Sequence, residues 1–229
     1  MPELDRLRAA IQCSGTVVIL EETTSTQDAA LAYGLQAGDV CIAVQQTSGR
    51  GRRGNTWNAD GGVALTVVAE QATPLLSIAV AASLAEQLER QIQQAVGIKW
   101  PNDLLVDGKK LAGILIEQRE GVCLIGVGVN VEPLDQRGAV SLVDLGCTES
   151  YEVVARGVVA ATLDARALSP ERAISLWQAR DVLIGTTQTV TSNNNSITGT
   201  VLAIDPLHHL LLETDAGQIA LNASTTTFH

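Results

Sequence analysis

The sequence predicts an α+β protein in which a sheet flanked by helices is followed by a small C-terminal β-barrel. Two observations support this prediction. Up to about residue 180, short apolar runs typical of strands alternate with longer segments in which apolar residues recur at helical spacing. Beyond that point, short strand-like runs follow one another closely and are separated by turn residues. We therefore expect a larger domain at residues 1–182 and a small barrel domain at residues 183–229.

The N-terminal third of the chain supplies two helices and three strands. We expect helices at residues 2–12 and 29–35, and strands at 16–20, 40–44 and 63–69. A hydroxyl residue, Ser25 or Thr26, precedes the second helix, which is typical of a helix N-terminus with free N–H groups. Two functions are open for these hydroxyl groups. They cap the helix, or they face a polar ligand together with the free amides.

A long helical pattern and a hairpin dominate the middle of the chain. We expect a core helix at residues 74–94 and strands at 104–106, 111–116 and 122–129. Asp107 and Gly108 separate two of these strands and form a strong hairpin signal. Because neighbouring strand side chains point to opposite faces, only one of Lys109 and Lys110 should face a site. The last strand ends in a Gly-Val-Gly run, which either lets a ligand approach the backbone or marks a bulge.

The C-terminal part begins with two helical patterns and continues with short strands. We expect helices at residues 150–166 and 170–179 and strands at 187–191, 197–204, 207–213 and 218–221. An asparagine run, an Asp-Pro pair and an Asp-Ala-Gly run separate the strands. These turn residues and the close spacing of the strands are the basis for the predicted barrel.

Positive charge is concentrated in two stretches of an acidic chain. The formal net charge is −10, from 15 Lys and Arg residues against 25 Asp and Glu residues. Residues 49–54 have the sequence GRGRRG and residues 97–117 contain three lysines, so these stretches hold six of the 15 basic residues. Glycine lets the main chain approach a ligand closely, and the guanidinium fork of arginine matches carboxylate and phosphate. The sequence therefore predicts a loop that closes on an anion.

The composition argues against several other classes of protein. A net charge of −10 is unsuited to general binding of nucleic acid or anionic membrane, and an aromatic content of 3% leaves few side chains to stack on bases. The chain has a charged start and no long uninterrupted apolar run, so we expect a soluble, cytoplasmic protein. The four cysteines are far apart and the three histidines lie at residues 208–229, so we expect buried free thiols, no metal site and no histidine triad.

Four motifs, in this order, resemble those of the biotin protein ligases: GRGRRG followed by Trp57, KWPNDL, KKLAGILIE and GVGVN. They span roughly residues 20–132, and the strand-rich C-terminal segment is similar to the small barrel of that family. The resemblance implies a class II synthetase-like catalytic domain with a mixed sheet. It also implies two reaction steps. Biotin and ATP form biotinyl-5'-adenylate and pyrophosphate with the help of Mg²⁺, and the biotinyl group then passes to a lysine of a biotin carboxyl carrier protein.

The resemblance also implies roles for individual residues. Those expected to bind biotin are Ser25, Thr26, Gln27, Gln46, Arg50, Gly51, Arg52, Lys110, Gly113 and Gly128. Those expected to bind ATP are Arg52, Arg53, Trp57, Lys99, Asn102, Lys110 and Asn130. Lys110, Arg52 and Lys99 are the expected catalytic residues, because cations offset the repulsion between the biotin carboxylate and the α-phosphate. The role of Asp103 stays open.

The chain departs from the family pattern at two places. Gln27 stands where the family commonly has asparagine, and the Ser-Pro pair and aromatic residue that often follow Trp57 are missing. One alternative is a lipoate or octanoate ligase, whose glycine-rich signature contains a histidine, whereas this chain has none before His208. A non-catalytic biotin-binding regulator is another. The catalytic signature begins too near Met1 for an N-terminal DNA-binding domain, so we expect no DNA binding. Both a monomer and a homodimer are open.

Overall fold

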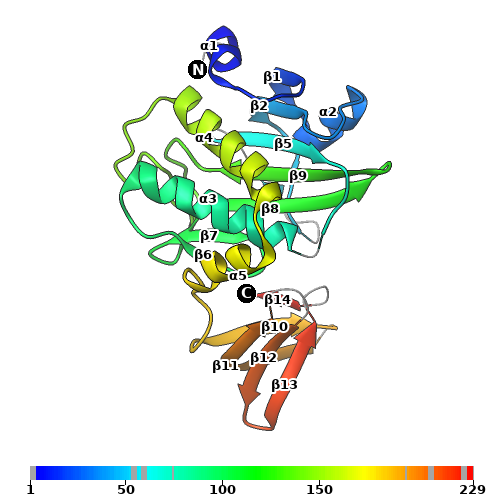
Figure 1. Ribbon diagram of the computed structural model, residues 1–229. Coiled ribbons are helices and arrows are strands. Elements are labelled where there is room, and N and C mark those ends of the chain that lie inside the picture. Colours follow the sequence, from blue (N-terminus) through cyan, green and yellow to red (C-terminus); the bar gives the residue numbers. More distant parts are fainter. Residues whose placement is uncertain are drawn as a thin grey trace.

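The computed structural model describes residues 4–52, 56–57, 61–73, 75–193, 195–205, 209–222 and 226–228. Figure 1 shows a large sheet with helices on it and a smaller sheet below. The large sheet has seven strands in the order β1-β2-β5-β9-β8-β7-β6. They are β1 (Val17–Thr23), β2 (Val40–Gln46), β5 (Val63–Ala69), β6 (Gly97–Lys99), β7 (Asp103–Val106), β8 (Lys109–Arg119) and β9 (Val122–Val129). β1 and β2 are parallel and the other neighbours are antiparallel, so the sheet is mixed, as expected.

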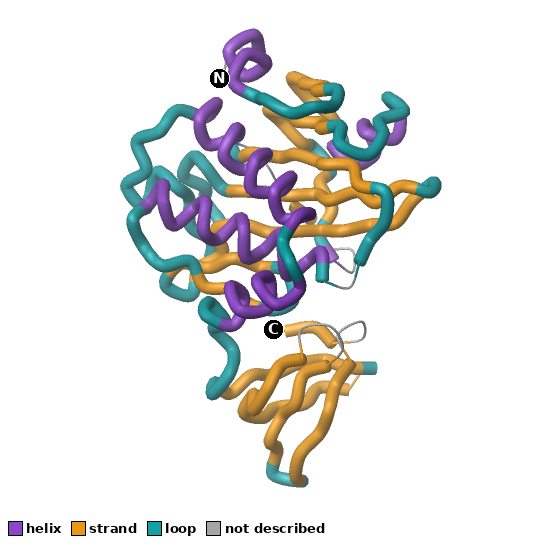
Figure 2. The backbone as a smooth tube through the Cα atoms, in the orientation of Figure 1, coloured by secondary structure: helices purple, strands orange, loops and turns teal. Residues whose placement is uncertain are grey.

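Helices cover both faces of this sheet. The interior strand β5 is buried at all seven positions, which suits its valine-rich sequence. Successive side chains point to opposite faces. Val67 packs in the main core with α3 (Leu76–Ile92) and α4 (Tyr151–Asp164), while Val68 packs in a second cluster with α2 (Thr26–Ala32). Figure 2 shows α3 and α4 lying across one face of the sheet.

The predicted helices are confirmed with small shifts at their ends. The expected core helix is α3, in which ten of 17 residues are buried. The remaining helices are α1 (Leu4–Ala10), α5 (Pro170–Gln178) and the 3₁₀-helix η2 (Ala165–Ala167). α5 begins where the sequence favours a start, because Ser169 accepts a hydrogen bond from Arg172 N and Pro170 occupies the first turn.

A five-stranded antiparallel sheet forms the C-terminal part, in the order β13-β12-β11-β10-β14. Its strands are β10 (Thr187–Ser192), β11 (Asn195–Asp205), β12 (His209–Thr214), β13 (Gly217–Asn222) and β14 (Thr226–Phe228). The register between β11 and β12 shifts between Val201 and Ala203. Four of the strands match the predicted ones, and the sheet is consistent with the expected small barrel. The division at residue 182 stays a prediction.

Four short strands were not predicted. They are β3 (Gly49–Arg50), β4 (Thr56–Trp57), β6 and β14, each two or three residues long. The edge strand β6 pairs with β7, and the chain after α5 joins it on its other side, where Ile98 N donates to Arg180 O at 2.7 Å. Among the described residues, no helix is both long enough and apolar enough to cross a membrane.

Candidate functional site

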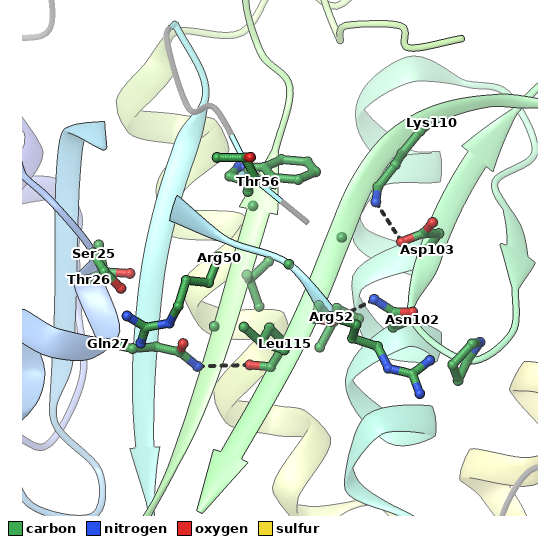
Figure 3. Close-up of a pocket in the computed structure, with 18 of the residues that line it drawn as sticks. Ser25, Thr26, Gln27, Arg50, Arg52, Thr56, Asn102, Asp103, Lys110 and Leu115 are labelled. Atoms are coloured by element: carbon green, nitrogen blue, oxygen red, sulfur yellow. Dashed lines mark hydrogen bonds and ion pairs between the residues drawn. The ribbon is translucent and has the colours of Figure 1, made fainter. Parts of the chain in front are cut away.

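A pocket lies over the middle of the seven-stranded sheet, beside the start of α2 (Figure 3). Its walls come from the start of α2, the β3–β4 hairpin, strands β8 and β9, and the segment that enters β7. The structure places 13 predicted site residues on these walls: Ser25, Thr26, Gln27, Gln46, Arg50, Gly51, Arg52, Trp57, Lys99, Asn102, Lys110, Gly113 and Gly128. The predicted biotin and ATP residues therefore line one continuous pocket. The roles assigned to them stay predictions.

Two predicted site residues are not found on the pocket wall. Arg53 lies outside the described residues. Asn130 is 7% exposed, and its Nδ2 atom donates to Lys110 O and to Val140 O, each at 3.1 Å. The structure thus places Asn130 just after β9 and beside the start of β8, where it binds the backbone of Lys110. Its contact with a nucleotide stays a prediction.

A side chain from β2, rather than the preceding serine, caps α2. The side chain of Ser25 makes no capping hydrogen bond. Gln46 Oε1 instead accepts from Thr26 N at 2.9 Å and from Thr26 Oγ1 at 3.3 Å, and Thr66 Oγ1 donates to Thr26 Oγ1 at 2.9 Å. The capping function considered for Ser25 is therefore wrong. Its side chain, which is 3% exposed, belongs to the pocket wall.

The amide of Gln27 connects α2 to two strands of the sheet. Its Nε2 atom donates to Leu115 O at 3.0 Å and to Leu124 O at 3.3 Å, and the residue is 4% exposed. Figure 3 shows the first of these bonds. Because both N–H groups are used, the carbonyl oxygen is the atom through which Gln27 can accept a hydrogen bond from a ligand.

Two glycines and a tryptophan form an apolar middle section of the pocket. Gly113 and Gly128 are directly opposite each other on β8 and β9, and the indole ring of Trp57 packs on them. A Cβ atom at Gly128 would overlap this ring, and one at Gly113 would lie 3.2 Å from Cζ3. Only glycine permits such close packing. The indole Nε1 atom is buried and has no hydrogen-bond partner among the described residues.

Lys110 lies at the other end of the pocket from the start of α2 and forms an ion pair. Its Nζ atom is 2.7 Å from Asp103 Oδ1 and 5.3 Å from the centroid of the Trp57 ring. Both partners of the ion pair are partly exposed, at 35% and 27%, so an incoming anion can compete for the ammonium group. The neighbouring Lys109 is exposed. The prediction that only one of the two lysines faces the site is confirmed.

The segment that enters β7 is fastened to β8 by Asn102. Its Nδ2 atom donates to Ile114 O at 3.0 Å, and Ile114 N donates to Asn102 O at 3.0 Å. In the backbone register, Lys99 of β6 stands opposite Asp103 of β7. This clamp therefore fixes the wall that carries Lys99, Asn102 and Asp103.

The two described arginines of the GRGRRG loop point in different directions (Figure 3). The guanidinium group of Arg50 turns toward α2, where it binds Asp28 Oδ2 at 2.6 Å and Asp28 Oδ1 at 3.0 Å, and it also contacts Glu117 Oε2 at 3.2 Å. The side chain of Arg50 is therefore bound by carboxylates of the protein itself, and the contact of this residue with biotin stays a prediction. Arg52 instead extends toward the Asn102 side of the pocket.

Several pocket residues were not found from the sequence. Gly126 lies in the same Gly-Val-Gly run as Gly128, so the motif contained the signal. Thr226 of β14 is 1% exposed and also lines the pocket. No local pattern identifies Thr226, because it reaches the pocket only through the packing of the C-terminal sheet. The partners of Arg50 likewise come from α2 and from the far end of β8.

The described part of the chain contains no group of three or more His, Cys, Asp or Glu side chains that could hold a metal ion. Among the described pocket residues, the only carboxylate is that of Asp103. Mg²⁺ commonly binds one or two protein carboxylates together with substrate phosphates. The residues present thus fit a Mg²⁺ ion that arrives with a nucleotide, and they do not form a separate protein cage.

Comparisons with known proteins agree with this geometry. A biotin–[acetyl-CoA-carboxylase] ligase of Mycobacterium tuberculosis is 30% identical over 90% of this chain and 86% of its own length. A bifunctional ligase/repressor BirA of Salmonella typhimurium is 29% identical over 97% of this chain and 79% of its own length.

The fold is also found in solved structures. The biotin protein ligase from Aquifex aeolicus in complex with biotin and ATP has a TM-score of 0.82 at 21% identity, over 93% of this chain and 98% of that chain. The biotin protein ligase of Leishmania major in complex with biotinyl-5-AMP has a TM-score of 0.66 at 23% identity, over 92% and 100% of the two chains. Residues 18–132 match the model of the biotin/lipoate A/B protein ligase family. The chain is therefore a member of the biotin/lipoate A/B protein ligase family.

Proposed function

We propose that the protein is a biotin–protein ligase, which forms biotinyl-5'-adenylate from biotin and ATP and transfers biotin to a lysine of a biotin carboxyl carrier protein. The observation that carries this proposal is the division of the pocket into three sections. Buried hydroxyl and amide groups lie at one end, an apolar floor of glycines under a tryptophan lies in the middle, and cationic side chains lie at the other end. Biotin has a ureido ring, an aliphatic chain and a carboxylate in the same order.

The first end suits a ureido group because it offers both donors and acceptors. The hydroxyl of Ser25 can donate to the ureido oxygen and Gln27 Oε1 can accept from a ureido N–H, while the hydroxyl proton of Thr26 is already used in the cap of α2. All three residues are buried, at 3–4% exposure, so an unmatched ligand would leave polar atoms without partners. Lipoate has a dithiolane ring that forms no such bonds. We therefore favour biotin over lipoate as the substrate.

At the cationic end, two anions have to meet. A biotin carboxylate oxygen attacks the α-phosphorus of ATP, and the bond to pyrophosphate breaks. Lys110, Arg52 and Lys99 offset the repulsion between carboxylate and phosphate and stabilise the negative charge that develops. For Lys110 this requires an exchange of partner from Asp103 to the incoming anion, which the partial exposure of the pair allows.

The nucleotide brings the Mg²⁺ ion that this chemistry uses. When bound, the ion neutralises phosphate charge, and Asp103 is the described pocket residue that could bind it. Asn102 keeps Asp103 and Lys99 in place through its bonds to β8. We propose that Trp57 and Arg53 lie beside the nucleotide as well.

In the second step, the amine of the carrier lysine attacks the carbonyl carbon of the mixed anhydride, and AMP leaves. Water would destroy this anhydride, so the pocket has to stay covered until the carrier arrives. The carrier that the relatives' names suggest belongs to acetyl-CoA carboxylase. We further propose that the reaction takes place in the cytoplasm, that residues 183–229 form a separate domain, and that the chain does not bind DNA.

The first step can be tested without a carrier. The purified protein is incubated with Mg²⁺, ATP labelled at the α-phosphate, and either biotin or lipoate, and the products are separated. We expect labelled biotinyl-adenylate with biotin and no lipoyl-adenylate with lipoate. If an adenylate formed with lipoate but not with biotin, the protein would be a lipoate ligase and this proposal would be wrong. Binding of biotin without any adenylate would point to a regulator.

A further inference from the structure

Four charged side chains beside the pocket form a cluster that we call the Arg50 latch. It consists of Asp28 on α2, Arg50 on β3, and Glu117 and Arg119 at the end of β8. Arg50 donates to both carboxylate oxygens of Asp28, at 2.6 and 3.0 Å. Two parallel N–H···O bonds define the orientation of a guanidinium group more strictly than one bond does.

The charges of the latch balance only when Arg50 is present. Arg119 Nη1 lies 2.6 Å from Asp28 Oδ1 and 3.6 Å from Glu117 Oε2. The side chains of Asp28, Glu117 and Arg119, which stand on the helix and the sheet, therefore carry two negative charges and one positive charge. A net charge of −1 remains for Arg50 of the loop. These three side chains therefore form a site whose charge is balanced by the guanidinium group of Arg50.

The ionisation of the pair agrees with this geometry. The hydrogen bond from Arg50 is the main cause that lowers the pKa of Asp28 below its ordinary value, and the same bond is the main cause that raises the pKa of Arg50. Both groups are therefore charged at neutral pH. Their side chains are 35–40% exposed, so water weakens the attraction. The latch is better suited to directing the loop than to stabilising the whole fold.

The backbone links Arg50 to the pocket. Arg50 pairs with Thr56 of β4, and Gly49 pairs with Trp57, whose ring lies over the glycine floor. The next residue, Gly51, lines the pocket itself. A change in the position of the Arg50 guanidinium group would therefore move the hairpin that forms one wall of the pocket.

We propose that the Arg50 latch positions residues 49–52 at the pocket, so that Arg50 acts through its side chain as a positioning residue and not as a ligand for the anionic substrate. Arg52, two residues later, has its side chain on the pocket side of the loop. Arg50 therefore anchors the loop, and Arg52 takes part in the reaction. The effect on the reaction rests on the proposed function, whereas the position of the loop is a property of the protein alone.

The position of the loop can be measured without substrate, by hydrogen exchange of peptides that cover residues 45–52. Asp28→Asn removes the charge that binds Arg50 and keeps the size of the side chain. Glu120→Gln is the matched control, because Glu120 is an exposed acid just beyond the end of β8. We expect exchange in this segment to be at least tenfold faster in Asp28→Asn and unchanged in Glu120→Gln, with α3 and α4 as protected as in the parent. Equal protection of the loop in Asp28→Asn and the parent would overturn the proposal.

Kinetics distinguish a latch from a general loss of structure. In the adenylation assay, we expect Asp28→Asn to raise KM for biotin about tenfold with a smaller change in kcat, and to release the adenylate faster. Glu117→Gln removes the charge that contacts Arg50 at 3.2 Å and Arg119 at 3.6 Å but leaves Asp28 in place, so it should have a smaller effect of the same kind. If Arg50 instead bound the substrate anion, loss of Asp28 would lower KM. An unfolded Asp28→Asn protein combined with a Glu117→Gln protein identical to the parent would also contradict the latch. A parent without adenylation but with a loosened loop in Asp28→Asn would contradict only the proposed function.

Discussion

Gln46 Oε1 lies 2.9 Å from the backbone nitrogen of Thr26, so a strand residue caps a helix that begins 20 residues earlier in the chain. The first N–H groups of a helix have no partner within it, and an oxygen that accepts from them stabilises the helix. Here the acceptor is shared with the hydroxyl group of Thr26. The cap therefore joins the start of α2, the end of β2 and one end of the pocket.

Replacement of this acceptor should destabilise the protein measurably. We expect Gln46→Met to lower the free energy of unfolding by about 1 kcal/mol, the usual effect of losing a helix cap. It should also raise KM for biotin, because Thr26 loses its support. Urea unfolding measures the first effect. Gln45→Met is the control, since Gln45 is the exposed neighbour on the same strand, and a loss as large in this control would show that the cap is not responsible.

The glycine floor should tolerate no side chain under the tryptophan. We expect Gly128→Ala to raise KM for biotin at least tenfold, because its Cβ atom would overlap the indole ring of Trp57, and Gly113→Ala to have a smaller effect. Steady-state adenylation measures both. When Trp57 is also replaced by alanine, Gly128→Ala should cause little further increase in KM for biotin. If Gly128→Ala raised KM by the same factor with and without Trp57, the overlap with the indole ring would not be the cause.

Lys110 should contribute more to the reaction than to biotin binding. Lys110→Met removes the ammonium group, and we expect single-turnover formation of adenylate to fall about 100-fold or more, because charge in the transition state loses a partner. The affinity for biotin, measured by calorimetry, should fall much less. Lys109→Met is the matched control on the exposed side of the same strand. If Lys109→Met were as slow as Lys110→Met, the assignment would be wrong.

Thiol reactivity should follow burial. Burial raises the pKa of Cys41 to about 12, so this thiol stays protonated, and hence unreactive, at every pH below that value in the folded protein. Burial also raises the pKa of Cys123, and Cys147 is buried, whereas Cys13 is partly exposed. At pH 8 we expect a thiol reagent to modify one cysteine quickly and all four only after denaturation. Fast modification of three or four thiols in the native protein would contradict this burial.

Most helices and strands could be predicted from the sequence because their signals are local. The apolar spacing of α3 and the Asp-Gly turn between β7 and β8 are examples. Strands of two or three residues, such as β3 and β14, bury too few side chains to leave a pattern. The order of the sheet, in which β9 lies between β5 and β8, depends on contacts between distant parts of the chain.

The site was predicted largely through motifs, and its internal contacts were not. The resemblance identified 13 of the residues that line the pocket, but it did not show that Arg50 binds Asp28 or that Asn130 supports Lys110. The atoms of such pairs are separated by 20 or more residues in the sequence. Their pairing follows from the fold, because only the folded sheet brings α2, β3 and the end of β8 together.

The most direct test of the account is the complete reaction on a carrier. The purified protein is mixed with Mg²⁺, ATP, biotin and the unmodified carrier domain of an acetyl-CoA carboxylase, and the carrier is analysed by intact mass spectrometry. We predict one added biotinyl group, located on a single lysine and absent when that lysine is replaced by arginine. The same mixture with lipoate should leave the carrier unchanged. A folded protein that leaves the carrier unmodified with biotin, or that attaches lipoate, would contradict the account.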